Sequence, residues 1–127
     1  MNLTGMKLSY VMLRVSDIAE SVAFWRDQVG LETNWAGGEF AFFPLGETYL
    51  TLNQPPSFER QVSDTEVVLG VEDVMAVYAE MKDRGVPFEV EPRPVTNDGT
   101  RSLLSAYFRD PDGHLASLTG WIDGVDL

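Results

Sequence analysis

Two segments of the chain share one sequence pattern, and this repeat limits the possible folds more than any other feature of the sequence. Residues 10–17 (YVMLRVSD) and 66–73 (EVVLGVED) align without gaps at an offset of 56 residues and match at Val, Leu, Val and Asp. Apolar residues alternate in both segments, which is typical of a strand with one buried face. The repeat therefore predicts two copies of one supersecondary unit.

After each of these segments the spacing of apolar residues changes to that of a helix. The apolar stripe consists of Ile18, Val22, Trp25 and Val29 in the first copy and of Val74, Val77, Tyr78 and Met81 in the second. Asp17 and Asp73 are expected to cap the helix N-termini, because a short acidic side chain accepts hydrogen bonds from the free backbone N–H groups there. Gly30 and Gly85 are expected to end the helices. We expect Trp25 to lie in the core.

Three short segments bounded by Gly or Pro follow each helix and are predicted as strands. They are residues 31–35, 40–43 and 48–53 in the first copy, and 88–91, 103–108 and 115–119 in the second. Residues 92–99 are expected to form a long loop. The chain is thus predicted as a single domain over 1–127, with module 1 at about 8–53, a Pro-containing linker at about 54–63, module 2 at about 64–119 and a tail at 120–127 that Trp121 anchors.

Composition excludes several classes of partner. Nine Lys and Arg against twenty Asp and Glu give a formal charge of 9 − 20 = −11, which repels nucleic acid and anionic membrane surfaces. The chain has no Cys and one His, His114, so it lacks the ligands of common zinc, copper and iron sites. No signal peptide and no stretch of about 18 apolar residues is evident. A cytoplasmic protein that contacts neither nucleic acid nor membrane is expected.

The two predicted βαβββ modules resemble the vicinal oxygen chelate superfamily, with residues 15–31 (VSDIAESVAFWRDQVGL) and 108–114 (FRDPDGH) as the most similar motifs. This superfamily includes glyoxalase I, extradiol dioxygenases, fosfomycin-resistance enzymes and bleomycin-resistance proteins. The resemblance covers residues 8–119. It implies an α+β fold in which two βαβββ modules form a curved, cup-like mixed sheet with the helices outside.

The resemblance also implies where a metal would bind, because relatives that use one take a ligand from the first and last strand of each module. The corresponding residues are Tyr10, Thr51, Glu66 and Ser117. Only Glu66 is a good ligand for a divalent cation, since hydroxyls bind weakly and a phenol must first lose a proton. No metal site and no cofactor are therefore expected.

By strand alternation and comparison with related strands, a ligand-binding cup is expected to contain a larger set of side chains. The expected set is Tyr10, Met12, Arg14, Trp35, Phe40, Phe42, Tyr49, Thr51, Glu66, Ser105, Tyr107 and Ser117. Two interpretations of Phe40 and Phe42 stay open: they line a small-molecule site, or they fill a closed core. Trp35 is expected to cover or stack on a planar ligand, or to pack at a dimer interface. His114 is expected to be structural.

These expectations favour a metal-free protein, similar to bleomycin-resistance proteins, that sequesters a hydrophobic, aromatic or cationic small molecule such as an antibiotic or metabolite. The alternative is a glyoxalase-like lyase, isomerase or hydrolase. In that enzyme Glu66 is the base or the ligand of a weakly held divalent metal, and Tyr10 is an acid or a hydrogen-bond donor to an oxyanion. A regulatory or biosynthetic accessory module without a soluble ligand is a third hypothesis, so whether the chain is an enzyme stays open. The resemblance further implies a homodimer.

Overall fold

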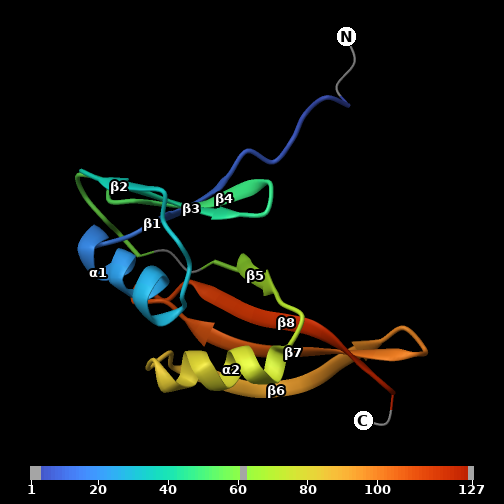
Figure 1. The fold of residues 1–127 in the computed structure, drawn as a ribbon. Coiled ribbons are helices and arrows are strands. Elements are labelled where there is room, and N and C mark those ends of the chain that lie inside the picture. Colours follow the sequence, from blue (N-terminus) through green and yellow to red (C-terminus); the bar gives the residue numbers. More distant parts are fainter. Residues whose placement is uncertain (1–3, 61–62, 126–127) are drawn as a thin grey trace. The chain divides into compact units, whose positions relative to one another are not determined.

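The computed structural model describes residues 4–60 and 63–125. The chain divides into two compact units, Met1–Arg60 and Gln61–Leu127. Each unit contains one four-stranded sheet and its own helical segment, as Figure 1 shows. Among the described residues, no helix is long and apolar enough to cross a membrane.

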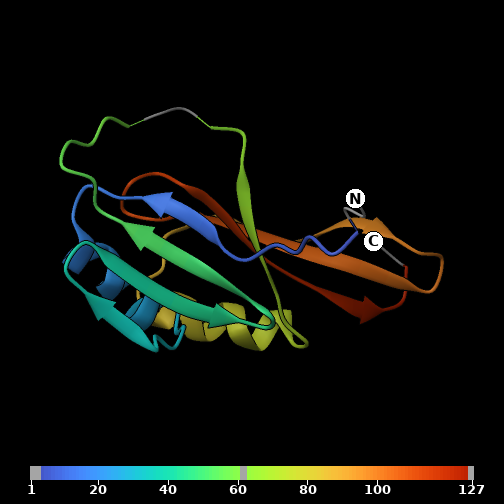
Figure 2. The same cartoon turned by 90° about the horizontal axis from the view of Figure 1, so that it is seen from above.

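Unit 1 has a mixed sheet with the strand order β1-β4-β3-β2. Its elements are β1 (Val11–Arg14), α1 (Ile18–Ala23), the π-helical turn η1 (Phe24–Gln28), β2 (Trp35–Gly37), β3 (Phe40–Leu45) and β4 (Thr48–Asn53). Strands β1 and β4 are parallel and the other pairs are antiparallel. Figure 2 shows these strands, in blue to green, side by side.

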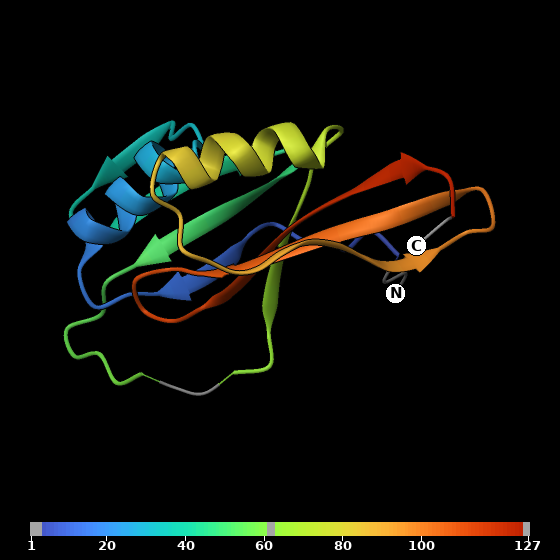
Figure 3. The same ribbon diagram turned by 90° about the horizontal axis from the view of Figure 1, so that it is seen from below.

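Unit 2 repeats this connectivity with the order β5-β8-β7-β6. Its elements are β5 (Glu66–Gly70), α2 (Val74–Asp83), β6 (Phe88–Asn97), β7 (Arg101–Arg109) and β8 (Leu115–Asp123). Strands β5 and β8 are parallel, and α2 packs on β6, β7 and β8. Figure 3 shows α2 in yellow and these three strands in orange to red. The predicted pair of βαβββ-like modules in an α+β fold is thus confirmed; a cup formed by both sheets stays a prediction.

Short side chains and glycines set the helix ends where the sequence predicted them. The Asp17 carboxylate accepts a hydrogen bond from the backbone N–H of Glu20 at 3.1 Å, and Asp73 accepts one from Ala76 at 3.0 Å. Gly30 and Gly85 follow the helices with φ of 94° and 92°, values that favour glycine. Helix α1 passes into the π-helical turn η1, in which the N–H of Val29 donates to the carbonyl of Phe24 five residues earlier.

Each sheet buries one face against the helical segment of its unit, and the opposite face carries the remaining side chains of the strands. In unit 1, Phe43 on β3 and Leu52 on β4 are fully buried, as is Trp25 in η1. The core position predicted for Trp25 is therefore correct. In unit 2, Phe108 on β7 and Met81 on α2 are buried in the same way. Alternation along these strands places every second side chain on the face away from the helix.

Most strand boundaries differ from those predicted: β3 extends to Leu45, β7 covers Arg101–Arg109, and three further differences follow. Residues 31–34 are not a strand, and β2 begins only at Trp35. The segment predicted as a loop over 92–99 is strand as far as Asn97, because β6 is an edge strand where proline removes no needed hydrogen bond, and register shifts absorb the irregularity. Strand β8 extends to Asp123, so Trp121 lies in a strand and not in a tail. Its ring lies under the Arg101 guanidinium, 4.8 Å from it.

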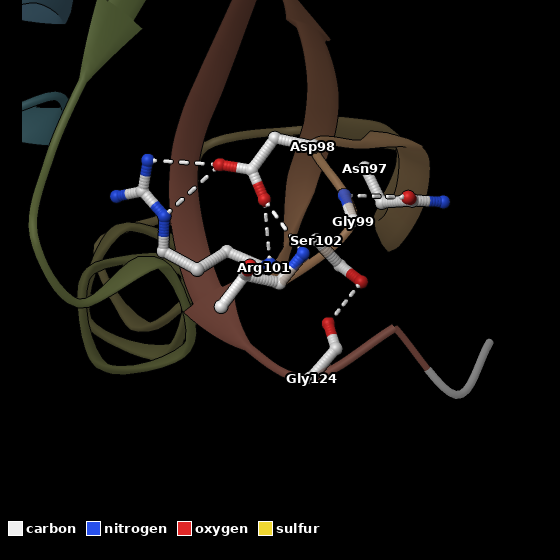
Figure 4. Close-up of polar contacts among 7 residues, drawn as sticks. Asn97, Asp98, Gly99, Arg101, Ser102 and Gly124 are labelled. Atoms are coloured by element: carbon white, nitrogen blue, oxygen red, sulfur yellow. Dashed lines mark hydrogen bonds and ion pairs between the residues drawn. The ribbon is translucent and has the colours of Figure 1, made fainter.

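Polar contacts at the β6–β7 turn hold these extended strand ends together (Figure 4). The Asp98 carboxylate accepts backbone hydrogen bonds from Arg101 at 2.7 Å and Thr100 at 3.0 Å, and it pairs with the Arg101 guanidinium at 3.1 Å. These contacts, that from the Arg101 backbone first, hold the pKa of Asp98 below its ordinary value of 3.8. The Ser102 hydroxyl donates to the carbonyl of Gly124 at 2.6 Å and fixes the end of β8 against β7.

Candidate functional site

The side-chain directions on strand β3 bear on the two interpretations of Phe40 and Phe42, a small-molecule site or a closed core. Ala41 and Phe43 are fully buried on the helix side of the sheet. Phe40 and Phe42 alternate with them and point to the other face, where Phe40 is 36% exposed. The two side chains therefore do not fill the core beneath α1, and their contact with a ligand stays a prediction.

Four aromatic side chains gather on this face, and we call them the aromatic face: Tyr10, Phe40, Phe42 and Tyr49. Phe42 is at the centre, with its ring centroid 6.5 Å from Tyr10, 6.5 Å from Phe40 and 6.2 Å from Tyr49. Phe40 is stacked on Phe42, and the two tyrosines meet it edge-on. Tyr10 and Tyr49 keep 49% and 36% of their surface exposed. Exposed aromatic clusters of this kind are typical of interaction sites.

A pocket of about 480 Å³ opens beside the aromatic face. It is lined by Lys7, Ser9, Tyr10, Asn34, Phe42, Glu47 and Tyr49. The Thr48 hydroxyl donates to the carbonyl of Ser9 at 3.0 Å and holds the segment before β1 against β4. Lys7 and Glu47 carry opposite charges, so the wall has no net charge although the chain is strongly acidic. Its size and mixed lining are those of a small-molecule site.

Thr51 lies on this same face in the middle of the sheet, with Met12 of β1 on one side and Phe42 of β3 on the other. Thr51 is fully buried, and its hydroxyl has no hydrogen-bond partner among the described residues. Met12 is partly buried and Arg14, further along β1, is exposed. Trp35 begins β2 opposite Phe42, and its side chain lies outside the described part of the structure.

In unit 2 the positions equivalent to Tyr10 and Thr51 are Glu66 and Ser117, and a hydrogen bond joins them. The Ser117 hydroxyl donates to the Glu66 carboxylate at 2.5 Å, as their shared face of the sheet allows. Tyr107 is the register partner of Ser117, and Ser105 is that of Thr119. At the two positions where unit 1 has Tyr10 and Thr51, unit 2 thus has a carboxylate and a hydroxyl that are hydrogen-bonded to each other.

His114 is tied into the turn before β8. Its Nδ1 lies 2.7 Å from the Asp110 carboxylate, which also accepts hydrogen bonds from the backbone N–H groups of Asp112 and His114. These contacts agree with the structural role expected for the imidazole.

Sequence reasoning did not find the polar wall of the pocket. Lys7, Ser9 and Asn34 belong to segments outside the strands, where alternation does not apply. Glu47 could have been found from the sequence, because Gly46 before it indicates a tight turn. Gly46 has a φ of 59° and forms the turn between β3 and β4 that places Glu47 in the pocket wall.

The chain can now be compared with known proteins. A sequence model of the Glyoxalase/Bleomycin resistance protein/Dioxygenase superfamily matches residues 7–118. The chain belongs to this superfamily.

Individual superfamily relatives are similar at about the same level. The chain is 31% identical over 127 residues to the uncharacterized protein YraH of Bacillus subtilis (strain 168), covering 89% of this chain and 97% of YraH. It is 32% identical over 117 residues to the metallothiol transferase FosB of Shouchella clausii (strain KSM-K16), covering 85% and 75%. It is 29% identical over 126 residues to a probable lactoylglutathione lyase of Synechocystis, covering 89% and 94%.

Solved structures of the superfamily have the same fold. A glyoxalase/bleomycin resistance protein/dioxygenase from Nocardioides has a TM-score of 0.77 at 19% identity, covering 98% of this chain and 89% of that one. A lactoylglutathione lyase from Agrobacterium tumefaciens has a TM-score of 0.72 at 21% identity, covering 92% and 95%.

The residues at the superfamily's metal positions do not fit a metal. Thr51 offers a hydroxyl, Tyr10 faces Phe42, and one oxygen of the single carboxylate, Glu66, already accepts a hydrogen bond from Ser117. No group of three or more His, Cys, Asp or Glu is placed to hold a metal in residues 4–60 and 63–125. Zinc, copper and iron sites require several imidazole, thiolate or carboxylate donors, which this set lacks.

Proposed function

We propose that the chain is a metal-independent binding protein that takes an uncharged or cationic aromatic small molecule against its aromatic face. The observation that carries this proposal is the cluster around Phe42, three of whose members also line the pocket. A planar ring gains affinity there by burying apolar surface and by edge and face contacts with three rings. The polar wall would orient its substituents.

Charge narrows the ligand class. The chain's formal charge of −11 disfavours anions at long range. Lys7 and Glu47 leave the pocket wall itself neutral, so a positive charge on the ligand is not required. A neutral aromatic ligand and an aromatic cation are therefore both expected to bind, and an aromatic anion to bind poorly.

The test is a titration with three probes that share one ring system: 2-naphthol, 2-naphthyltrimethylammonium and naphthalene-2-sulfonate. Calorimetry should give saturable binding at one site per chain for the first two, and an affinity about tenfold lower for the sulfonate. Chelator in the buffer should change none of these affinities. The proposal fails if none of the three probes saturates the protein, or if binding requires an added divalent metal.

The hydrogen bond between Ser117 and Glu66 favours a second candidate function, a glyoxalase-like enzyme with Glu66 as general base. Relatives named as a metallothiol transferase and a probable lactoylglutathione lyase point the same way. Glu66 is not among the residues that line the pocket beside the aromatic face. Under the binding proposal, Glu66→Gln therefore leaves the affinity for 2-naphthol within about twofold of wild type. If the wild-type protein turns over a substrate and Glu66→Gln does not, that result would instead support the enzyme.

A further inference from the structure

The hydroxyl of Thr51 is anomalous within its own strand. Thr51 is 0% exposed, and its Oγ1 has no hydrogen-bond partner among the described residues. On the same strand, the Thr48 hydroxyl donates to Ser9 and the Asn53 amide donates to the carbonyl of Glu39. A buried hydroxyl without a partner weakens the folded state, whereas valine has nearly the same shape and no such penalty. The hydroxyl therefore needs an explanation other than stability.

The repeat supplies a direct comparison. Thr51 and Ser117 occupy equivalent positions, and so do Tyr10 and Glu66. In unit 2 the Ser117 hydroxyl donates to the Glu66 carboxylate. In unit 1 the equivalent of that carboxylate is Tyr10, whose ring meets Phe42 edge-on. Unit 1 thus keeps the donor, while the residue that would supply the acceptor is part of the aromatic face.

The position of Thr51 links it to the pocket. Phe42, its register partner on β3, and Tyr49, two residues earlier on β4, both line the pocket and share its face of the sheet. On the other side its register partner is Met12, a partly buried side chain that can turn aside because it is unbranched and flexible. A ring lying against Phe42 and Tyr49 would place its substituent next to the hydroxyl.

We infer that Thr51 is a specificity-determining residue: its hydroxyl donates a hydrogen bond to an oxygen substituent on the ring of a bound aromatic molecule. The ligand class is then a phenol, aryl ether or aryl ketone, whose oxygen takes the place that a Glu66 oxygen has in unit 2. This inference rests on the proposed function of the aromatic face and adds to it the chemistry by which one arene is preferred over another.

Thr51→Val is the informative substitution, because it removes the hydroxyl and keeps the β-branched shape that suits a strand. Ser21→Ala is a matched control. The Ser21 hydroxyl is also fully buried without a partner among the described residues, but it lies on helix α1. Without ligand, neither variant should have a melting temperature below that of the wild type. The melting temperature of Thr51→Val should be roughly 2 to 5 °C higher than that of the wild type.

The test compares 2-naphthol with 2-methylnaphthalene, which has a methyl group in place of the hydroxyl. The wild-type protein is expected to favour 2-naphthol, and Thr51→Val to reduce the ratio of the two affinities about tenfold, mainly by weakening 2-naphthol. Ser21→Ala should leave the ratio unchanged. Comparing ratios between variants cancels the different hydrophobicity of the two arenes.

The outcomes separate the two proposals. If both arenes bind the wild-type protein and Thr51→Val keeps the wild-type ratio, the role of Thr51 is refuted while the aromatic binding function stands. A ratio that Ser21→Ala lowers as much as Thr51→Val also refutes it, because the effect would then come from packing. If neither arene binds wild type, the proposed function itself fails, and the inference fails with it.

Discussion

Replacing Gly120 with alanine is expected to lower the free energy of unfolding by about 3 kcal/mol, the upper end of typical overpacking costs. A Cβ at this position of β8 would lie 2.4 Å from the carbonyl oxygen of Val71 and 2.7 Å from Cγ2 of Val74. The first of these contacts is with backbone, which cannot rotate away. The clash therefore forces β8 away from the start of α2. Urea unfolding followed by circular dichroism measures the loss.

Gly70→Ala is the control for this prediction. Gly70 ends β5 in the same unit, and a Cβ there would meet nothing within 4 Å. Neither glycine has a positive φ, so backbone strain is not expected in either variant. Gly70→Ala should stay within about 0.5 kcal/mol of wild type. If both variants lose the same free energy of unfolding, the close approach of Val71 is not what makes glycine necessary at position 120.

Removing the central ring of the aromatic face should weaken binding more than any other single change on that face. Phe42→Ala is expected to lower the affinity for 2-naphthol about 100-fold, which is the effect of a binding hot spot. Phe42 contacts all three other rings of the aromatic face and lines the pocket, so its loss removes both apolar area and the support of Tyr10 and Tyr49. Calorimetric titration of the variant gives the change directly.

Phe40→Ala provides the matched comparison on the same strand. Phe40 stacks on Phe42 but does not line the pocket, so its removal should cost at most about fivefold in affinity. Thermal melting of both variants checks that each remains folded. Wild-type affinity in folded Phe42→Ala would place the ligand elsewhere and refute the aromatic face as the binding site.

The parts of the fold that could be predicted are those set by local pattern. The repeated octets, the caps at Asp17 and Asp73 and the glycines after the helices depend on neighbours within a few residues, and they identified both modules. The bounds of β6 were wrong because proline is read as a strand breaker unless the edge position of the strand is known. That position depends on pairing across the whole unit.

The candidate site was predictable only in part, for a related reason. The resemblance put Phe42 and Thr51 in one expected set, but only the register shows that they are direct neighbours across strands. The pocket wall at Lys7 and Glu47 comes from segments without a periodic pattern. The missing partner of Thr51 has no sequence signal at all, because it is a property of the assembled strands. The homodimer implied by the resemblance stays a prediction.

The prolines of β6 have a consequence for the outer edge of the second sheet. Pro92 and Pro94 lack the N–H groups that an incoming strand would need, and the register of β6 against β7 is irregular around them. An outer strand of this kind is a poor template for uncontrolled growth of the sheet into aggregates. The opposite edge of the second sheet, β5, contains no proline and so keeps the backbone N–H groups that a further strand would pair with.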